Sequence, residues 1–133
     1  MTASNQAANA ADERRAAFSA WREAVDLERL GHFGGAVSRA YYAAYQAAQA
    51  LLYEKGIEPK THEGVRRMLG LHYVLPGLLP GERALALNQL ALLRESSDYA
   101  PAAPATREEA RQALRLSGEF LTGAGLSLGG DGE

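Results

Sequence analysis

Apolar side chains recur every three or four residues along much of this chain, a spacing typical of helices that bury one face. The clearest stretch covers 36–55, AVSRAYYAAYQAAQALLYEK, and its many Ala and Leu residues favour one long helix. Its apolar residues fall on one stripe, which we expect to face the core: Val37, Tyr41, Ala44, Ala48, Leu51 and Leu52. A second stripe beside it is polar and aromatic, formed by Arg39, Tyr42, Gln46, Gln49 and Tyr53. We expect the rest of the chain to pack around this helix.

Two further helices are predicted on either side of it. A helix over 12–30 ends at Gly31, because glycine readily adopts the left-handed conformation that stops a helix. A helix over 62–75 begins after Thr61, a residue type that often caps helix amino ends. Its apolar residues form no clean stripe, so the pattern alone does not say which side faces the core.

Two more helices are predicted in the carboxy-terminal half. In the helix over 82–99, four leucines are expected in the core: Leu85, Leu87, Leu90 and Leu93. Thr106 and Glu109 match a capping box, so another helix should begin there. No alternating strand pattern competes with these assignments. We therefore predict an all-α fold, an up-and-down bundle of four to five helices.

The length of 133 residues suits one folded domain. Residues 1–11 are small and polar, so we expect a disordered tail before a helical domain over 12–126. The glycines near the carboxy terminus predict that 127–133 form a flexible tail.

Composition removes several classes of function. The formal net charge of −2 gives no global attraction for nucleic acid, so any RNA contact requires a local cluster of basic residues. The chain has no cysteine, and its three histidines form no HExxH pair, so we expect neither a metal site nor a cofactor. It contains no apolar run of about 20 residues and no signal-peptide core. We therefore expect a cytoplasmic protein that does not enter a membrane.

Candidate chemistry lies at the end of the helix over 82–99, where Arg94, Asp98 and Tyr99 follow one another. Arg94 and Asp98 are four residues apart and can pair on one helix face, which contributes only a few tenths of a kcal/mol. Tyr99 directly precedes a break in the helix. An ordinary surface ion pair and a functional site are both compatible with this local pattern.

Three segments together make the chain recognisable. R-A-Y-Y-A lies in the helix over 36–55, K-T-H-x-G-V covers 60–65, and R-x-x-x-D-Y covers 94–99. With these segments in this order, the chain resembles the HEPN domain family over about residues 16–122. Each segment is a weak signal alone, whereas the three together are specific.

The resemblance implies a bundle of four or five helices that usually forms homodimers, with a cleft at the dimer interface. Many members are metal-independent ribonucleases, and many are encoded beside a small nucleotidyltransferase as toxin–antitoxin pairs. In catalytic members an Arg is followed after four to six residues by a His, on the helix that corresponds to 82–99 here. That Arg holds the scissile phosphate, and the His transfers protons.

This chain departs from the catalytic motif after Arg94, because Asp98 and Tyr99 stand close to where the His is expected. An ionised Asp repels phosphate, and an ordinary Tyr is a poor base at neutral pH. We therefore expect a partner or nucleic-acid-associated module in a nucleotidyltransferase-linked, toxin–antitoxin-like system. Two alternatives stay open. One is a metal-independent endoribonuclease toxin that uses Arg94 with Asp98 and Tyr99, and the other is an interaction scaffold with no nucleic-acid role.

Three other residues are candidates for cleft or binding roles. Arg39 and Tyr42 lie on the polar stripe of the helix over 36–55, and His62 belongs to the K-T-H-x-G-V segment. If Arg39 pairs with Asp98, Arg94 is left free for a phosphate or a partner carboxylate. The alternative is that these residues form a buried polar network that fixes the register of the helices. His62 is expected to hydrogen-bond across its turn or beneath the cleft.

One further pair has the catalytic spacing without the catalytic position. Arg67 and His72 have four residues between them, yet they lie on the helix over 62–75, before the position expected from the resemblance. Such two-residue matches are common by chance in an arginine-rich chain, so we expect this one to be coincidental.

Overall fold

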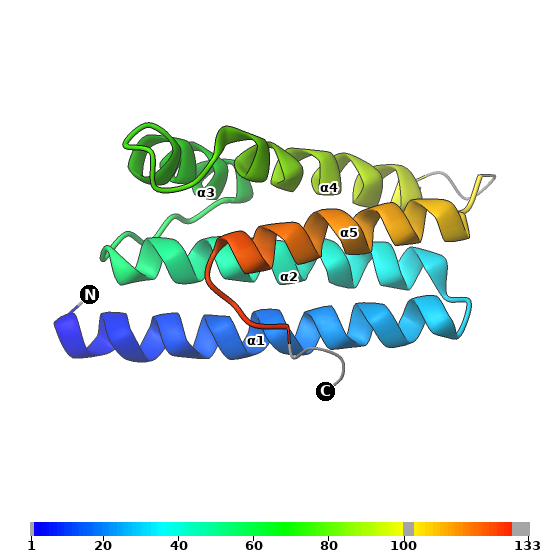
Figure 1. Cartoon of the computed structure of the whole chain (residues 1–133), viewed down its shortest axis with the longest axis horizontal. Coiled ribbons are helices and arrows are strands. Elements are labelled where there is room, and N and C mark those ends of the chain that lie inside the picture. Colours follow the sequence, from blue (N-terminus) through cyan, green and yellow to red (C-terminus); the bar gives the residue numbers. More distant parts are fainter. Residues whose placement is uncertain (1, 100–102, 129–133) are drawn as a thin grey trace.

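The computed structural model describes residues 2–99 and 103–128 of the chain. Along these residues run five α-helices and one π-helical turn: α1 (Ala3–Arg29), α2 (Phe33–Glu54), α3 (His62–Leu69), η1 (Gly70–Val74), α4 (Gly81–Tyr99) and α5 (Arg107–Gly123). The described residues contain no strand. Figure 1 shows α1 and α2 antiparallel along the long axis, with α3 and α4 in a layer on the other side of α2. The predicted all-α bundle is therefore confirmed.

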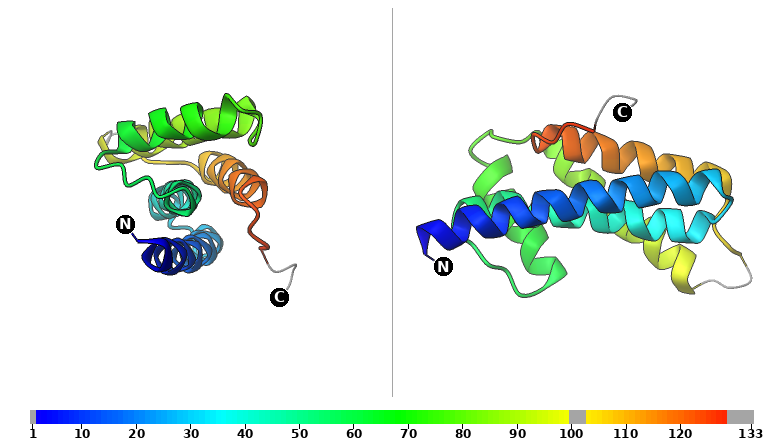
Figure 2. Two further views of the ribbon diagram at one scale, coloured as in Figure 1. Left: turned by 90° about the vertical axis from the view of Figure 1, so that its left-hand side faces the viewer. Right: turned by 90° about the horizontal axis from the view of Figure 1, so that it is seen from below.

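Helix α2 lies at the centre of the bundle. It packs against α1, α3, α4 and α5, and the end-on view in Figure 2 shows it between α1 and the α3–α4 layer, with α5 alongside. The six residues of its predicted core stripe are all buried: Val37, Tyr41, Ala44, Ala48, Leu51 and Leu52. Alanines on the facing side of α1, including Ala17, Ala20 and Ala24, are fully buried as well. These small side chains let the two long helices approach closely.

Helix α1 is longer than the sequence suggested. We expected a disordered tail over 1–11, but α1 begins at Ala3, where the Thr2 hydroxyl accepts a hydrogen bond from the Asn5 amide. Packing explains the difference, because Ala10 is only 3% exposed and the Gln6 side chain donates to the Glu54 carbonyl at the end of α2. Contacts with α2 therefore extend the helix over residues that carry little sequence signal.

The carboxy-terminal half follows the expected helices with two differences. The helix predicted over 62–75 is α3 followed by the π-helical turn η1, within which the buried Tyr73 hydroxyl donates to the Leu51 carbonyl of α2. Leu85 of α4 was expected in the core, but 53% of it is exposed, whereas Leu87 and Leu90 are buried. In α5 the predicted capping box between Thr106 and Glu109 is present.

The chain leaves α5 through a glycine turn. Gly125 has a φ of 91°, a conformation that L side chains rarely adopt. The segment after it runs back toward α1 in Figure 1, and the remaining expected tail, 129–133, lies outside the described residues.

Within the described helices, none combines the length and apolar content needed to cross a bilayer.

Candidate functional site

A pocket of about 470 Å³ opens where α2, α3 and α4 meet. Helix α2 contributes Tyr41, and α3 contributes His62 and Arg66. The α4 side consists of Asn88, Ala91, Leu92, Arg94 and Glu95. The pocket thus combines one Tyr, one His and two Arg side chains from segments far apart in sequence.

The His62 ring is held by two tyrosines of α2. Its Nδ1 atom lies 2.5 Å from the Tyr41 hydroxyl, with which it shares a hydrogen bond. Its ring stacks on Tyr45, with centroids 4.1 Å apart and planes inclined by 27°. Thr61 caps α3 by accepting from the Gly64 amide at 2.9 Å, so the first residue of this helix, His62, has a fixed backbone position. The imidazole is therefore oriented from both sides.

The Arg94 guanidinium lies against the same aromatic cluster. Its central carbon is 4.9 Å from the ring centroid of Tyr42 and 5.4 Å from that of Tyr41. Its Nε is 3.4 Å from an Asp98 carboxylate oxygen, a charge contact that lacks hydrogen-bond geometry, and among the described residues this buried atom has no hydrogen-bond partner. Arg94 is thus positioned by cation–π contacts and keeps unused hydrogen-bonding capacity.

Arg66 brings a second cation to the pocket. It is one helical turn beyond His62 on α3, and residues four apart lie on the same helix face. Within the described part of the chain, Arg66 forms no ion pair. The exposed Glu95 also lines the pocket and partly offsets this positive charge.

The electrostatic environment favours an uncharged imidazole. Burial lowers the pKa of His62, and the positive charges of Arg94 and Arg66 lower this pKa further. Burial raises the pKa of Tyr41, although the same two arginines oppose the increase. At neutral pH the pocket therefore holds a neutral His, a neutral Tyr and two cations.

Arg39 does not pair with Asp98, the arrangement that would have left Arg94 free. The Arg39 Nε lies 2.9 Å from a Glu23 oxygen on α1, while Asp98 is paired with Arg94. The register of α2 against α1 places Arg39 beside Glu23. The Tyr42 ring lies near two guanidiniums. The central carbon of Arg39 is 5.9 Å from the ring centroid, and Arg94 lies against the same ring.

Only some of the other candidate residues lie in the pocket between α2, α3 and α4. His62 and Arg94 come together in the pocket, and His62 bonds beneath it to Tyr41. Tyr99 ends α4, but its side chain lies outside the part of the chain that the structure describes. Arg67 and His72 do not line this pocket.

Two residues of the site were missed by the sequence reasoning. Arg66 had a usable signal, its spacing of four from His62 on a predicted helix. Tyr45 had a weaker one, because its contact with His62 joins residues from different helices and depends on how α3 packs on α2.

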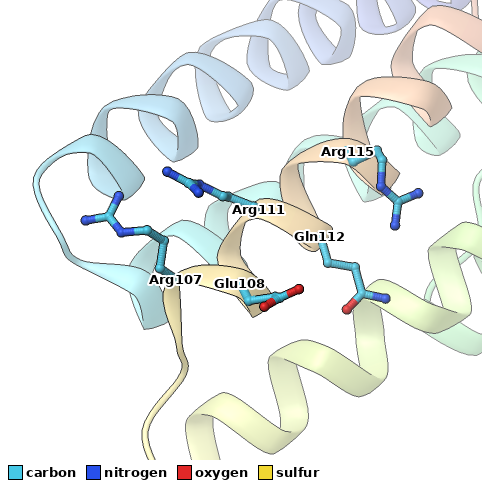
Figure 3. A pocket seen from close by; sticks show the side chains of 5 residues that line it. All are labelled: Arg107, Glu108, Arg111, Gln112 and Arg115. Carbon is cyan, nitrogen blue, oxygen red and sulfur yellow. The ribbon is translucent and has the colours of Figure 1, made fainter.

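A larger pocket of about 780 Å³ lies along α5 and is lined by Arg107, Glu108, Arg111, Gln112 and Arg115 (Figure 3). Its charges are largely compensated. One nearly buried Glu28 oxygen lies 2.6 Å from Arg107 Nη1 and 3.3 Å from Arg111 Nε, and Arg115 faces Glu119 at 4.0 Å. Arg107 and Arg111 tie α5 to α1, so the smaller pocket is the better candidate for binding chemistry.

Among the described residues, no three His, Asp or Glu side chains gather as a metal site requires.

Comparison with known proteins finds several relatives in sequence. A protein named UPF0332 protein PH1297, from Pyrococcus horikoshii, is 51% identical over 49 residues, which are 37% of this chain and 34% of that protein. A protein named "Putative toxin MJ0605", from Methanocaldococcus jannaschii, is 39% identical over 86 residues, 65% of this chain and 63% of that protein. UPF0332 protein glr0978 of Gloeobacter violaceus is 31% identical over 90 residues, 67% of this chain and 71% of that protein.

The match therefore spans about a third of the Pyrococcus relative and less than two thirds of the Methanocaldococcus relative. The sequence pattern of the HEPN domain matches residues 10–124, which include all of α2, α3, α4 and α5. This chain belongs to the HEPN domain family.

Proposed function

We propose that this chain is a toxin-like HEPN module that binds the phosphodiester backbone of single-stranded RNA in the pocket between α2, α3 and α4. One observation carries the proposal. Two guanidiniums, Arg66 and Arg94, and the uncharged imidazole of His62 meet in one pocket of about 470 Å³. Guanidinium groups bind phosphate oxygens through charge-assisted hydrogen bonds.

The local charge matters because the whole chain has a formal net charge of −2. Binding must then come from a few well-placed groups instead of a broad basic surface. Arg94 suits this task, since Tyr41 and Tyr42 already hold its guanidinium and little conformational freedom is lost when a phosphate arrives. Glu95 and Asp98 weaken the attraction, so we expect moderate affinity and a clear dependence on salt.

The test is the affinity of the full chain for fluorescent single-stranded 2′-O-methyl RNA, which resists cleavage, over a range of salt concentrations. We expect Arg94→Ala to weaken binding about tenfold, or about 1.4 kcal/mol. The slope of log affinity against log salt should fall by about 0.7 for each phosphate that the variant no longer neutralises. Arg66→Ala should act in the same direction.

Arg115→Ala is the matched control, because this exposed arginine lies on α5 in the larger pocket and does not line the pocket between α2, α3 and α4. This variant should leave the affinity within about twofold, since it removes no cation from the proposed binding pocket. Absence of RNA binding at low salt would favour an interaction scaffold instead. Equal losses of affinity in Arg94→Ala and Arg115→Ala would place binding elsewhere on the surface.

A second part of the proposal is that the chain acts as a homodimer. The α3–η1–α4 layer carries large apolar side chains that are between 51% and 77% exposed: Leu71, Leu75, Leu78, Leu85 and Leu92. Exposed leucines concentrated on one layer favour association with a protein surface. Leu92 also lines the pocket, so a second copy bound here would cover its edge.

Sedimentation measurements test the dimer directly. Leu75→Asp combined with Leu85→Asp should convert a dimer to a monomer, because both charges would be buried in the interface. Leu30→Asp is the control, since Leu30 is 71% exposed at the end of α1 and away from this layer. A monomeric unaltered chain, or a dimer that survives the double substitution, would contradict the assignment.

The proposed setting is the cytoplasm, with a small nucleotidyltransferase as partner in a toxin–antitoxin-like pair. Support comes from membership of the HEPN family and from the relative named as a toxin. Co-expression with a small nucleotidyltransferase encoded beside this gene should give a complex that purifies intact and should relieve any growth arrest. Separate elution of the two proteins would contradict this part of the proposal.

A further inference from the structure

Among the described residues, no helix covers the side of α2 that faces away from α5. In the end-on view of Figure 2, α5 lies along one side of α2 and the opposite side is open. This open face of α2 consists of polar and aromatic residues at helical spacing: Arg39, Tyr42, Gln46, Gln49 and Tyr53. All five are half-buried, whereas the alanines of α2 are fully buried. The open face is therefore accessible and chemically distinct from the core side of the same helix.

The open face continues from the pocket between α2, α3 and α4. Tyr42 belongs to this face, and its ring centroid is 4.9 Å from the central carbon of Arg94, which lines the pocket. Gln46 follows Tyr42 by one helical turn, about 6 Å along the helix axis. A strand whose phosphate is bound by Arg94 can therefore place a neighbouring base over Gln46.

Two oxygen acceptors beside the open face lack hydrogen-bond donors. Gln46 Oε1 and Glu13 Oε1 are buried atoms without a partner in the part of the chain that the structure describes. The two side chains come from antiparallel helices, whose register follows from the pair of Arg39 with Glu23. That register places Glu13 opposite the α2 segment 46–53. The two unpartnered oxygens thus belong to one region of the α1–α2 surface.

The charge of Glu13 acts on this region. Burial raises the pKa of Tyr53, and the charge of Glu13 raises it further. Burial also raises the pKa of Glu13 itself. An ionised carboxylate that is partly buried without donors is unfavourable, so a ligand that supplies N–H groups would relieve this cost.

Tyr53 supplies an aromatic surface in the same region. The rings of Tyr42 and Tyr45 already contact a guanidinium or the His62 imidazole. Tyr53 has no such aromatic or cationic neighbour among the described residues. Bases of single-stranded RNA stack on tyrosine rings, and a half-buried ring without a stacking partner is suited to this contact.

We propose that this region binds a guanine base of the RNA, with Glu13 and Gln46 as hydrogen-bond acceptors and Tyr53 as the stacking surface. The inference rests on the proposed function, since the phosphate next to that base is held by Arg66 and Arg94. Guanine has two neighbouring donors on its Watson–Crick edge, the N1–H group and the N2 amino group, which match two acceptors.

The other bases fit two acceptors less well. Adenine and cytosine each combine one amino donor with a ring-nitrogen acceptor, and uracil has a single N–H donor between two carbonyl oxygens. A carboxylate repels these lone pairs. The site should therefore prefer guanine, most strongly over uracil.

The experiment measures the affinity of the full chain for three fluorescent 2′-O-methyl strands. They are a short oligouridine, the same strand with one central guanosine, and the same strand with one central inosine, which lacks the N2 amino group. We expect the guanosine strand to bind about tenfold more tightly than the oligouridine, as a good pair of base contacts provides. The inosine strand should lie between them.

Glu13→Gln should reduce the preference for guanosine over uridine to within about twofold, because the amide has one acceptor and directs a donor at the guanine donors. The variant should fold, since it removes a partly buried charge. Its affinity for oligouridine should stay within about twofold of the unaltered chain, because the phosphate-binding arginines remain. Glu119→Gln is the matched control, since this exposed carboxylate lies on α5, and it should keep the full preference.

The stacking role has a separate test. Tyr53→Ala should weaken binding of the guanosine strand about tenfold, whereas Tyr53→Phe, which keeps the ring, should bind within about twofold of the unaltered chain. Equal losses in the two variants would contradict stacking on Tyr53.

The outcomes separate this inference from the proposed function. Equal affinity for all three strands would overturn guanine recognition and leave the RNA-binding proposal standing, whereas no binding of any strand would remove both. An unchanged preference in Glu13→Gln would overturn the role of this carboxylate. Guanosine monophosphate has the same base edge, and it should compete at least about a hundredfold more weakly than the guanosine strand, which also makes the phosphate contacts. Equal competition would assign the region to a free nucleotide instead of RNA.

Discussion

The Tyr41 hydroxyl and His62 Nδ1 lie 2.5 Å apart, and this contact joins the central helix of the bundle to the start of α3. Tyr41 is only 1% exposed, so its hydroxyl meets its hydrogen-bonding requirement inside the protein. The same side chain packs in the core and lies beneath the Arg94 guanidinium. The fold and the candidate site are thus linked through one residue.

Removing this hydroxyl should destabilise the fold. Tyr41→Phe leaves a His62 nitrogen without its partner, and we expect a loss of about 1–2 kcal/mol in the free energy of unfolding. Urea denaturation measures the change. Tyr53→Phe is the control, because Tyr53 is half-buried and within the described residues its hydroxyl forms no hydrogen bond. Equal effects of the two substitutions would contradict a specific role for the contact between Tyr41 and His62.

The titration of His62 should respond to Arg94. Because burial and the arginines lower the pKa of His62 in the folded protein, the unfolded chain binds this proton more readily. His62 therefore stabilises the fold fully above about pH 6.5, and this contribution is lost as the pH falls through that value toward the folded pKa. In Arg94→Ala, nuclear magnetic resonance titration should show a higher His62 pKa. An unchanged pKa would mean that Arg94 does not act on this ring.

Glu13 on α1 gives a stability prediction of the opposite sign. Burial raises the pKa of Glu13, the charge of Asp12 raises it further, and its Oε1 is buried without a hydrogen-bond partner among the described residues. The ionised carboxylate therefore costs stability once the pH exceeds the raised pKa. Glu13→Gln should stabilise the protein at pH 7 by less than about 1 kcal/mol, since the group is partly solvated.

This gain should disappear near about pH 3, where the Glu13 carboxyl is protonated in both the folded and the unfolded chain. Thermal unfolding at the two pH values provides the comparison. Glu58→Gln is the control, because Glu58 is exposed in the α2–α3 connection. A stabilisation of Glu13→Gln that is equal at both pH values would point to a cause other than charge.

Glu28 should be among the most important charged residues for stability. Its side chain is 12% exposed, and its carboxylate pairs with Arg107 and Arg111, which ties the end of α1 to the start of α5. Glu28→Gln leaves two guanidiniums without their partner and should destabilise the protein by about 1–3 kcal/mol in urea denaturation. Glu119→Gln, which affects an exposed pair with Arg115 at 4.0 Å, should change stability by less than about 0.5 kcal/mol.

The sequence was a good guide to the helices because their signals are local. The apolar stripe of 36–55, the capping box at Thr106 and the stop at Gly31, with a φ of 85°, all depend on residues close together in the chain. The helical start at Ala3 was missed because it depends on packing against α2. Leu85 was misplaced because helical spacing gives a period but not which leucines face outward.

The site was only partly predictable for a related reason. Arg94 and His62 were selected from motifs, but their meeting depends on how α3 and α4 pack on α2, which the spacing of residues in the chain does not specify. The pair of Arg39 and Asp98 that the sequence allowed does not form, because the packing of α2 on α1 gives Arg39 a different carboxylate, Glu23. Long-range side-chain partners are thus the part of the site that requires the structure.

The most direct measurement of the central proposal uses the three histidines of the chain as probes. Their imidazole signals are followed by nuclear magnetic resonance while single-stranded 2′-O-methyl RNA is added to the full chain. We predict that the His62 signals shift and saturate, whereas those of His32 and His72 remain unchanged, because His62 lines the pocket with Arg66 and Arg94. Shifts at His32 or His72 with no change at His62 would contradict RNA binding in this pocket.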